Sequence, residues 1–155
     1  MDRTALTGLL VAVAVLVAAS LAGLWWRRRD GRLRGVRPVA VPAQRSGEGT
    51  GEAAALAALG VRAGEVTLLQ FSSEFCAPCR VLSRVCGELA GERPGVVHVE
   101  VDAGSRLAEV RQLGIWRTPT LLIVDTAGRV AHRASGTPGR SRLRDAVTAL
   151  FPVPR

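Results

Sequence analysis

An unbroken apolar run near the N-terminus constrains this chain more than any other feature. No charged residue occurs between positions 5 and 26. As a helix rising about 1.5 Å per residue, this run is about 33 Å long, enough to cross a hydrocarbon core of roughly 30 Å. The run therefore predicts a transmembrane helix over 5–26. The rest of the 155 residues is enough for one small domain with a single core, and a multidomain enzyme is excluded.

Basic residues cluster directly after this run. The formal net charge is +8, and all 21 basic residues are Arg. The cluster that follows the run comprises Arg27, Arg28, Arg29, Arg32, Arg34 and Arg37. Such clusters orient a membrane helix and contact anionic headgroups. A nucleic-acid surface would interleave aromatic and basic side chains on a folded face, but the chain has only three Trp and three Phe. We expect membrane lipid, and no nucleic acid, as a partner.

The N-terminal run can also be compared with a cleaved signal peptide. Signal peptides carry an apolar stretch of about 7–15 residues followed by a small-residue cleavage site. This run is longer and ends in Trp25-Trp26 and three arginines, which favours an uncleaved, single-pass anchor. One Arg precedes the run and six follow it, so the positive-inside rule places the C-terminal domain in the cytoplasm, although the extracytoplasmic side stays open.

The composition changes twice after the anchor. Residues 27–52 are rich in Arg, Gly and Pro without apolar periodicity, which predicts a basic juxtamembrane segment and flexible linker. Residues 53–153 form the predicted domain. Apolar periodicity there indicates helices over 53–59, 76–90, 107–113 and 143–151, and strands over 66–71, 97–101, 120–124 and 130–135.

This order of elements predicts an α/β domain. Strands separated by helices call for parallel crossovers, and the closely spaced last two strands form an antiparallel hairpin. We therefore expect a mixed central sheet with helices on both faces. In the strand over 97–101, valines alternate with His98 and Glu100, so we expect His98 to face outward.

The chemistry of the chain concentrates in Cys76-Ala-Pro-Cys79. The motif follows a strand and opens a helix, so Cys76 lies at a helix N-terminus, where free N–H groups and the helix dipole stabilise a thiolate. Cys79 lies one turn further and can close a disulfide with Cys76, as a reversible dithiol requires. A zinc site would need four ligands, and Cys86, His98 and His132 lack the usual spacing, so we expect no metal site.

The domain resembles the thioredoxin superfamily over residues 53–153. The resemblance rests on Cys76-Ala-Pro-Cys79 between strand and helix, on Thr118-Pro119 before the next strand, and on Gly136 after the hairpin. It implies a thioredoxin-like fold and a cis Thr118–Pro119 bond, with the Thr118 backbone pairing with a substrate chain. It also implies that Phe75, Pro78 and Pro119 shape the substrate-binding surface. The dithiol itself carries the electrons, so no dissociable cofactor is expected.

Two departures from the family pattern concern proton transfer. Gln70 stands where thioredoxins place a buried acid near the second cysteine, and His98 stands where they often have a lysine. A neutral Gln70 cannot accept a proton from Cys79. His98 titrates near neutral pH and is the other candidate for proton transfer. Two smaller departures are Phe75 for the usual Trp and Ala77 for the usual Gly.

These features predict a membrane-tethered thiol–disulfide oxidoreductase that acts on protein substrates and exchanges electrons with a further redox partner. Cys76 is the expected nucleophile and Cys79 the resolving cysteine. Cys86 lies on the apolar stripe of the same helix and is expected to be a buried structural thiol. The alternative is a non-enzymatic binding module that holds a partner protein or a thiophilic metal such as Cu(I) through the cysteine pair.

Overall fold

The computed structural model describes residues 3–29, 33–35 and 48–151, within two compact units, Met1–Asp30 and Gly31–Arg155. The first unit is the helix α1 (Arg3–Arg29). Its segment Thr7–Trp25 has a mean hydropathy of 2.4 and is long and apolar enough to cross a membrane. A signal sequence near the N-terminus can meet the same criterion of length and hydropathy.

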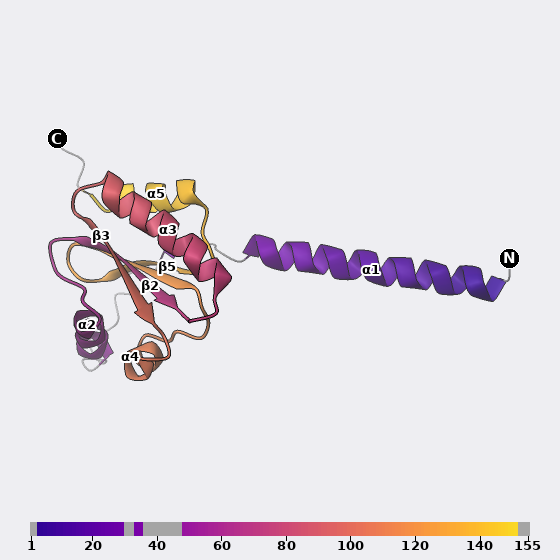
Figure 1. The fold of residues 1–155 in the computed structure, drawn as a ribbon, viewed down its shortest axis with the longest axis horizontal. Coiled ribbons are helices and arrows are strands. Elements are labelled where there is room, and N and C mark those ends of the chain that lie inside the picture. Colours follow the sequence, from indigo (N-terminus) through magenta and orange to yellow (C-terminus); the bar gives the residue numbers. More distant parts are fainter. Residues whose placement is uncertain (1–2, 30–32, 36–47, 152–155) are drawn as a thin grey trace. The chain divides into compact units, whose positions relative to one another are not determined.

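The second unit is built on a five-stranded mixed sheet (Figure 1). Its strands are β1 (Arg34–Gly35), β2 (Val66–Ser72), β3 (Val96–Asp102), β4 (Thr120–Val124) and β5 (Val130–Ser135). They lie in the order β1-β5-β4-β2-β3. β2 and β3 are parallel, whereas β2–β4, β4–β5 and β1–β5 are antiparallel. The predicted β4–β5 hairpin is therefore present.

The expectation of a parallel crossover is wrong for β4. The chain leaves β3 and enters β4 at the same end of the sheet, since Phe71 at the end of β2 pairs with Thr120 at the start of β4. The intervening helix α4 (Leu107–Gln112) has six residues and is about 9 Å long. The helix alone does not reach back along a seven-residue strand, which is about 23 Å long, and the chain enters β4 at the end of the sheet where β3 stops. β4 therefore runs antiparallel to β2.

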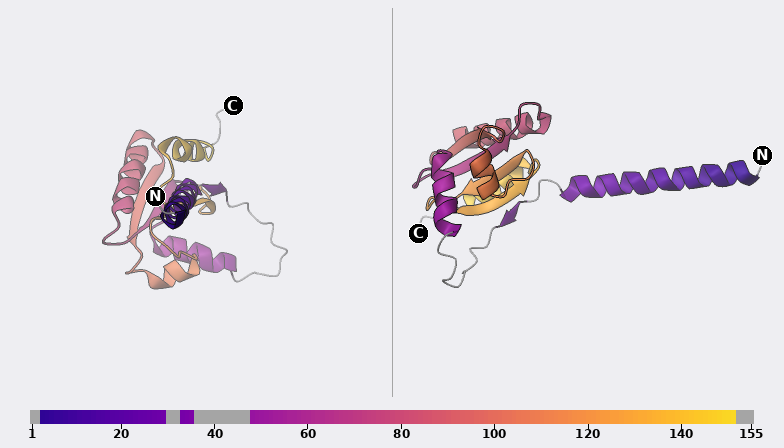
Figure 2. Two further views of the ribbon diagram at one scale, coloured as in Figure 1. Left: turned by 90° about the vertical axis from the view of Figure 1, so that its right-hand side faces the viewer. Right: turned by 90° about the horizontal axis from the view of Figure 1, so that it is seen from below.

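Helices cover both faces of the sheet, as predicted (Figures 1 and 2). α3 (Ala77–Glu92) and α5 (Arg140–Thr148) pack on one face, and α2 (Glu48–Ala58) and α4 on the other. The alternation of β2 divides its side chains between two cores. Val66 and Leu68 join Leu82, Cys86, Leu89, Leu143 and Val147 under α3 and α5. Leu69 and Phe71 join Ala55, Leu56, Leu59, Leu113 and Ile115 under α2 and α4.

Two parts of the predicted linker belong to regular structure. Gly35 of β1 pairs with His132 of β5, and Leu33 packs against the core under α3 and α5. α2 begins at Glu48 rather than at residue 53. Sequence patterns do not reveal these elements, because a two-residue edge strand has no periodicity and the start of α2 is rich in glycine. Residues 30–32 and 36–47 of the predicted linker lie outside the described residues.

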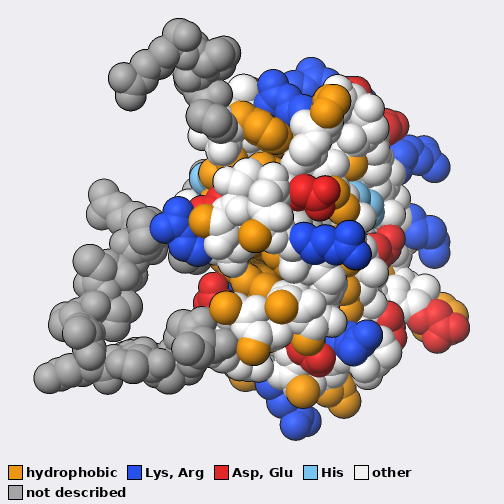
Figure 3. Space-filling model, turned by 90° about the vertical axis from the view of Figure 1, so that its left-hand side faces the viewer, with side chains coloured by type: hydrophobic (Ala, Val, Ile, Leu, Met, Phe, Trp, Pro, Cys, Tyr) orange, Lys and Arg blue, Asp and Glu red, His pale blue; other side chains and the backbone are white. Residues whose placement is uncertain are grey.

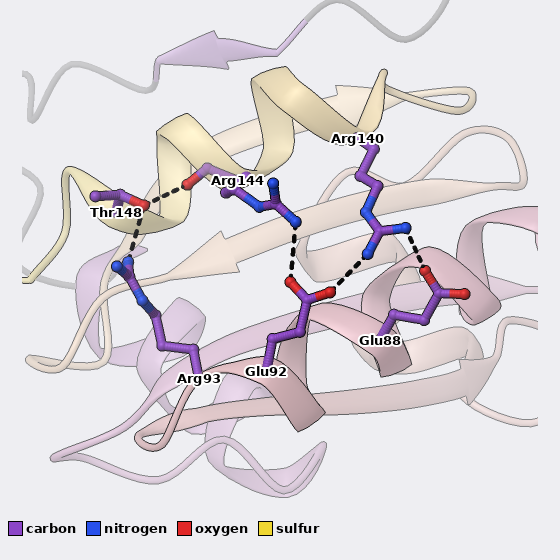
Figure 4. A network of polar contacts seen from close by, with 6 residues as sticks. All are labelled: Glu88, Glu92, Arg93, Arg140, Arg144 and Thr148. Carbon is purple, nitrogen blue, oxygen red and sulfur yellow. Dashed lines mark hydrogen bonds and ion pairs between the residues drawn. The ribbon is translucent and has the colours of Figure 1, made fainter.

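Ion pairs connect the outer surfaces of α3 and α5 (Figure 4). Arg140 contacts Glu88 and Glu92 at 2.7 and 2.6 Å, and Arg144 contacts Glu92 at 3.0 Å. Arg93, just after α3, donates to Thr148. Both carboxylates are about half exposed, so each pair contributes little alone. The molecular face drawn in Figure 3 mixes acidic and basic side chains.

Candidate active site

A disulfide joins Cys76 and Cys79 at the start of α3. Cys76 is the N-cap residue and directly follows the loop after β2, and Pro78 occupies the first turn, where a missing N–H costs nothing. The backbone N–H of Cys79 donates to the Cys76 Sγ at 3.2 Å. Cys76 is partly exposed, whereas Cys79 is 2% exposed. A thiolate at Cys76 would therefore have both an N–H donor and access to solvent.

The loop before β4 lies beside the loop that carries the cysteines. The Thr118–Pro119 peptide bond is cis, as the resemblance implied. The hydroxyls of Ser73 and Thr118 are 3.0 Å apart and share a hydrogen bond, which connects the two loops. The Gly136 N–H donates to the Pro119 carbonyl at 2.8 Å, so the residue after β5 holds the proline in place. Pro119 itself is buried.

Aromatic side chains are exposed at this end of the domain. Phe75, directly before Cys76, is 92% exposed, and Pro78 is also exposed. Trp116, two residues before Thr118, is 93% exposed. Sequence reasoning had singled out Phe75 and Pro78 but not Trp116. An aromatic residue between a short helix and a strand-opening proline was the only signal available for Trp116.

Gln70 is buried and contacts the backbone of Cys79. Its Nε2 is 2.9 Å from the Cys79 carbonyl, 2.8 Å from the Ser72 Oγ and 3.2 Å from the Glu100 Oε1. The side chain has two N–H donors for these three acceptors. Its Oε1 is buried and has no hydrogen-bond partner among the residues that the structure describes. Position 70 therefore places an amide, not an acid, against Cys79.

Sequence reasoning missed Glu100. The parallel register pairs Gln70 with Glu100, so both side chains lie on the face of the sheet that α3 covers. The Ser72 hydroxyl donates to the Glu100 Oε1, and the Ser83 hydroxyl donates to Oε2 at 2.7 Å. The alternation of His98 and Glu100 placed both on one face, but only the register of β2 and β3 shows that Glu100 lies beside Gln70.

His98 is not the surface residue that the strand pattern suggested. His98 pairs with Leu68, so the His98 side chain lies on the face of the sheet that α3 covers. The His98 side chain is half-buried there. Burial lowers the pKa of His98, and the charge of Glu100 opposes this shift. Its Nε2 is buried without a partner in the described part of the chain. No hydrogen bond between described residues connects His98 to Gln70 or Cys79.

Cys86 lies in the core two turns along α3 and is fully buried. Burial, with a smaller contribution from the charge of Glu100, raises the pKa of Cys86 to about 12. A thiol with such a pKa is almost never a thiolate near neutral pH. Within the described residues, no three His, Cys, Asp or Glu side chains gather as a metal site.

Comparison with known proteins relates this architecture to one family. The family model described as Thioredoxin matches residues 58–149. A thioredoxin of Chlamydia muridarum is 34% identical over 83 residues, which cover 52% of this chain and 78% of that protein. A thioredoxin of Haemophilus influenzae is 33% identical over 72 residues, 46% of this chain and 67% of that protein. The X-ray structure of Fasciola hepatica thioredoxin superposes with a TM-score of 0.51 and 25% identity, covering 57% of this chain and 84% of that chain.

Proposed function

Because this chain belongs to the thioredoxin family and is a thiol–disulfide oxidoreductase, we propose that it exchanges disulfides with protein substrates through Cys76 and Cys79 while α1 anchors it in a membrane. The observation that carries the proposal is the disulfide itself, with an accessible Cys76 at the helix N-terminus and a sheltered Cys79 behind it. The same pair serves as electron carrier, so the proposal invokes no dissociable cofactor.

The reaction proceeds in two exchange steps. The Cys76 thiolate attacks a sulfur of a substrate disulfide, a mixed disulfide forms, and the other substrate sulfur leaves as a thiolate. Cys79 then gives up its proton, which the released substrate thiolate takes up, and attacks the Cys76 sulfur, and the second substrate thiolate leaves. The substrate has gained two electrons and the protein holds the Cys76–Cys79 disulfide, which an external dithiol reduces again. In the opposite direction the same steps oxidise a substrate dithiol.

Phe75, Pro78 and Thr118 form the substrate-binding surface, and the buried Pro119 shapes it from below. The hydrogen bond between Ser73 and Thr118 supports this assignment, because it holds the Thr118–Pro119 loop beside the loop that leads into Cys76. In this proposal the Thr118 backbone pairs with an extended substrate chain. The exposed ring of Phe75 supplies apolar contact.

A disulfide-reduction assay tests the activity. The full chain in detergent, with dithiothreitol as the regenerating dithiol, should reduce the disulfides of insulin much faster than dithiothreitol alone. Cys76→Ser should abolish the acceleration, and Cys86→Ala, which leaves the pair intact, should keep it. A wild-type protein that gives no acceleration, while its disulfide is reduced and reoxidised normally, would contradict the proposed exchange with proteins.

A trapping experiment tests the assigned roles. Cys79→Ser should stall the reaction after its first step and leave Cys76 joined to its protein substrate by a bond that reductant dissolves. Cys76→Ser should trap nothing, because Cys79 is buried. The readout is a gel of blocked cell extract, run with and without reductant. Trapping by Cys76→Ser but not by Cys79→Ser would reverse the roles.

The anchor is the second part of the proposal. The apolar length of α1 supports an uncleaved single-pass helix, and the Arg cluster after it supports a cytoplasmic C-terminal domain. Anchored in this way, the domain meets substrates at a membrane surface, and contact between the Arg cluster and anionic lipid adds to its attachment.

A further inference from the structure

A carboxylate from the neighbouring strand completes the polar surroundings of Cys79. Glu100, an exposed residue of β3, accepts hydrogen bonds from Ser72 and Ser83, and its Oε1 lies 3.2 Å from the Gln70 Nε2. Ser83 lies one turn after Cys79 on α3, and Gln70 contacts the Cys79 carbonyl. The Glu100 charge thus lies beside the same turns of α3 that carry Cys79 and Cys86.

The hydrogen-bond inventory fixes the orientation of the Gln70 amide. Ser72 donates its one hydroxyl proton to Glu100, so its oxygen is free to accept from Gln70. One Nε2 proton then goes to Ser72 and the other to the Cys79 carbonyl. This assignment leaves Oε1 as a buried acceptor without a partner, which is costly in a folded protein. The disulfide offers no donor nearby, whereas reduction creates one in the Cys79 thiol.

We propose that Glu100 is the positioning residue of the Cys79 step: through Ser72 it orients the Gln70 amide so that Oε1 accepts the S–H of reduced Cys79, and its charge disfavours a second thiolate. Both effects stabilise the protonated form of Cys79. In the reduced protein only Cys76 is then an effective nucleophile, and Cys79 is deprotonated only when it resolves the mixed disulfide. This inference rests on the proposed roles of the two cysteines.

Other ionisable groups near Cys79 do not share these contacts. His98 lies on the same strand face as Glu100 but makes no hydrogen bond to the described residues of this network. Glu88 is an exposed carboxylate on α3 whose partner is Arg140. The remaining ionisable groups of the surrounding elements are Glu74 and Cys76 before α3, Arg80, Arg84, Cys86 and Glu92 on α3, Asp102 at the end of β3, and Arg117 before β4.

The test measures the alkylation rate of Cys79 against pH. In the full-length Cys76→Ser chain in detergent, iodoacetamide labelling of Cys79 is followed by mass spectrometry of its peptide, apart from that of Cys86. Adding Glu100→Gln should raise the Cys79 rate near neutral pH about tenfold, which corresponds to one pKa unit. The plateau rate at high pH should not change, because accessibility is the same. Ser72→Ala should raise the neutral rate less, since the charge stays.

Matched variants separate this role from a merely structural one. Glu100→Asp keeps the charge, so its profile should stay closer to that of the Cys76→Ser chain than the Glu100→Gln profile does. Glu88→Gln makes the same chemical change outside the network and should leave the profile unchanged. An unchanged profile for Glu100→Gln, or a rate increase equal at every pH, would overturn the proposal. These rates need no turnover, so a failure of the insulin assay would count against the proposed function and not against this role of Glu100.

Discussion

A single turn of helix gives the two disulfide-bonded cysteines different surroundings. Cys76 is partly exposed and receives an N–H from Cys79, whereas Cys79 is buried against Gln70. The third cysteine, Cys86, lies fully buried in the core, and its pKa is raised to about 12. Three thiols on one helix therefore differ in reactivity because of their position relative to its N-terminus.

Cys86 should be dispensable for exchange. Cys86→Ala removes one buried sulfur from a packed core and should lower the free energy of unfolding by about 1 kcal/mol. Cys86→Ser should cost more, because it buries a hydroxyl that needs a partner. Denaturant unfolding and the insulin assay measure the two effects. Loss of activity in a folded Cys86→Ala protein would show that this thiol takes part in exchange.

His98 should make the domain sensitive to mild acid. Burial lowers its pKa in the folded state below the ordinary value of about 6.5, so the folded protein binds fewer protons than the unfolded one. At pH values above 6.5, His98 is neutral in both states and the fold keeps its full stability. As the pH falls through the lower pKa of the folded state, this part of the stability is lost. Thermal unfolding at pH 7.5 and pH 5 should show a smaller drop for His98→Gln than for wild type. An equal drop would contradict this assignment.

At the scale of elements, α3 and α5 are held together by buried apolar contacts and by exposed ion pairs. Leu82, Leu89, Leu143 and Val147 pack against the sheet below, and Glu88, Glu92, Arg140 and Arg144 connect the two helices outside (Figure 4). Apolar burial supplies most of the stabilisation, since exposed ion pairs contribute little and are screened by salt.

The contribution of Glu92 should vanish in acid. The hydrogen bond from Arg144, followed by the charges of Arg140 and Arg144, lowers the pKa of Glu92 below its ordinary value. The ion pairs therefore stabilise the fold above that ordinary value, and this contribution is lost as pH falls through the folded pKa. The melting temperature of wild type should exceed that of Glu92→Gln slightly at pH 7 in low salt, and the two should converge below pH 4 or in 1 M salt. A difference that persists in both conditions would mean that packing, not charge, is responsible.

At the scale of the whole molecule, the proposed anchor makes a topology prediction. A reporter fused to the C-terminus should indicate the cytoplasmic side, because six Arg follow the apolar run and one precedes it. The protein should sediment with membranes, stay there after a carbonate wash, and keep its N-terminal segment. A soluble, shortened protein would show instead that the segment is a cleaved leader, and an external reporter would overturn the assigned side.

The sequence predicted those parts of the fold that local patterns determine. The apolar stripe of Leu82, Cys86 and Leu89 locates α3, and the motif at Cys76 locates its start. β1 and the direction of β4 could not be predicted, since both depend on partners distant in sequence. The site divides in the same way. Cys76, Cys79 and Pro119 are visible as a motif, whereas Glu100 becomes a neighbour of Gln70 only through the register of β2 and β3.

The short pairing of β1 with β5 affects whether copies of the protein can associate through their sheet edges. An open strand edge is a template for pairing with another molecule, and anchoring of the proposed kind concentrates copies on one surface. Gly35 covers part of the β5 edge at His132, and Arg34 pairs with Arg133 beside it. β1 thus also reduces self-association through the edge of the sheet. A soluble version that begins at residue 53 would lack β1 and expose an unpaired, aggregation-prone part of the β5 edge.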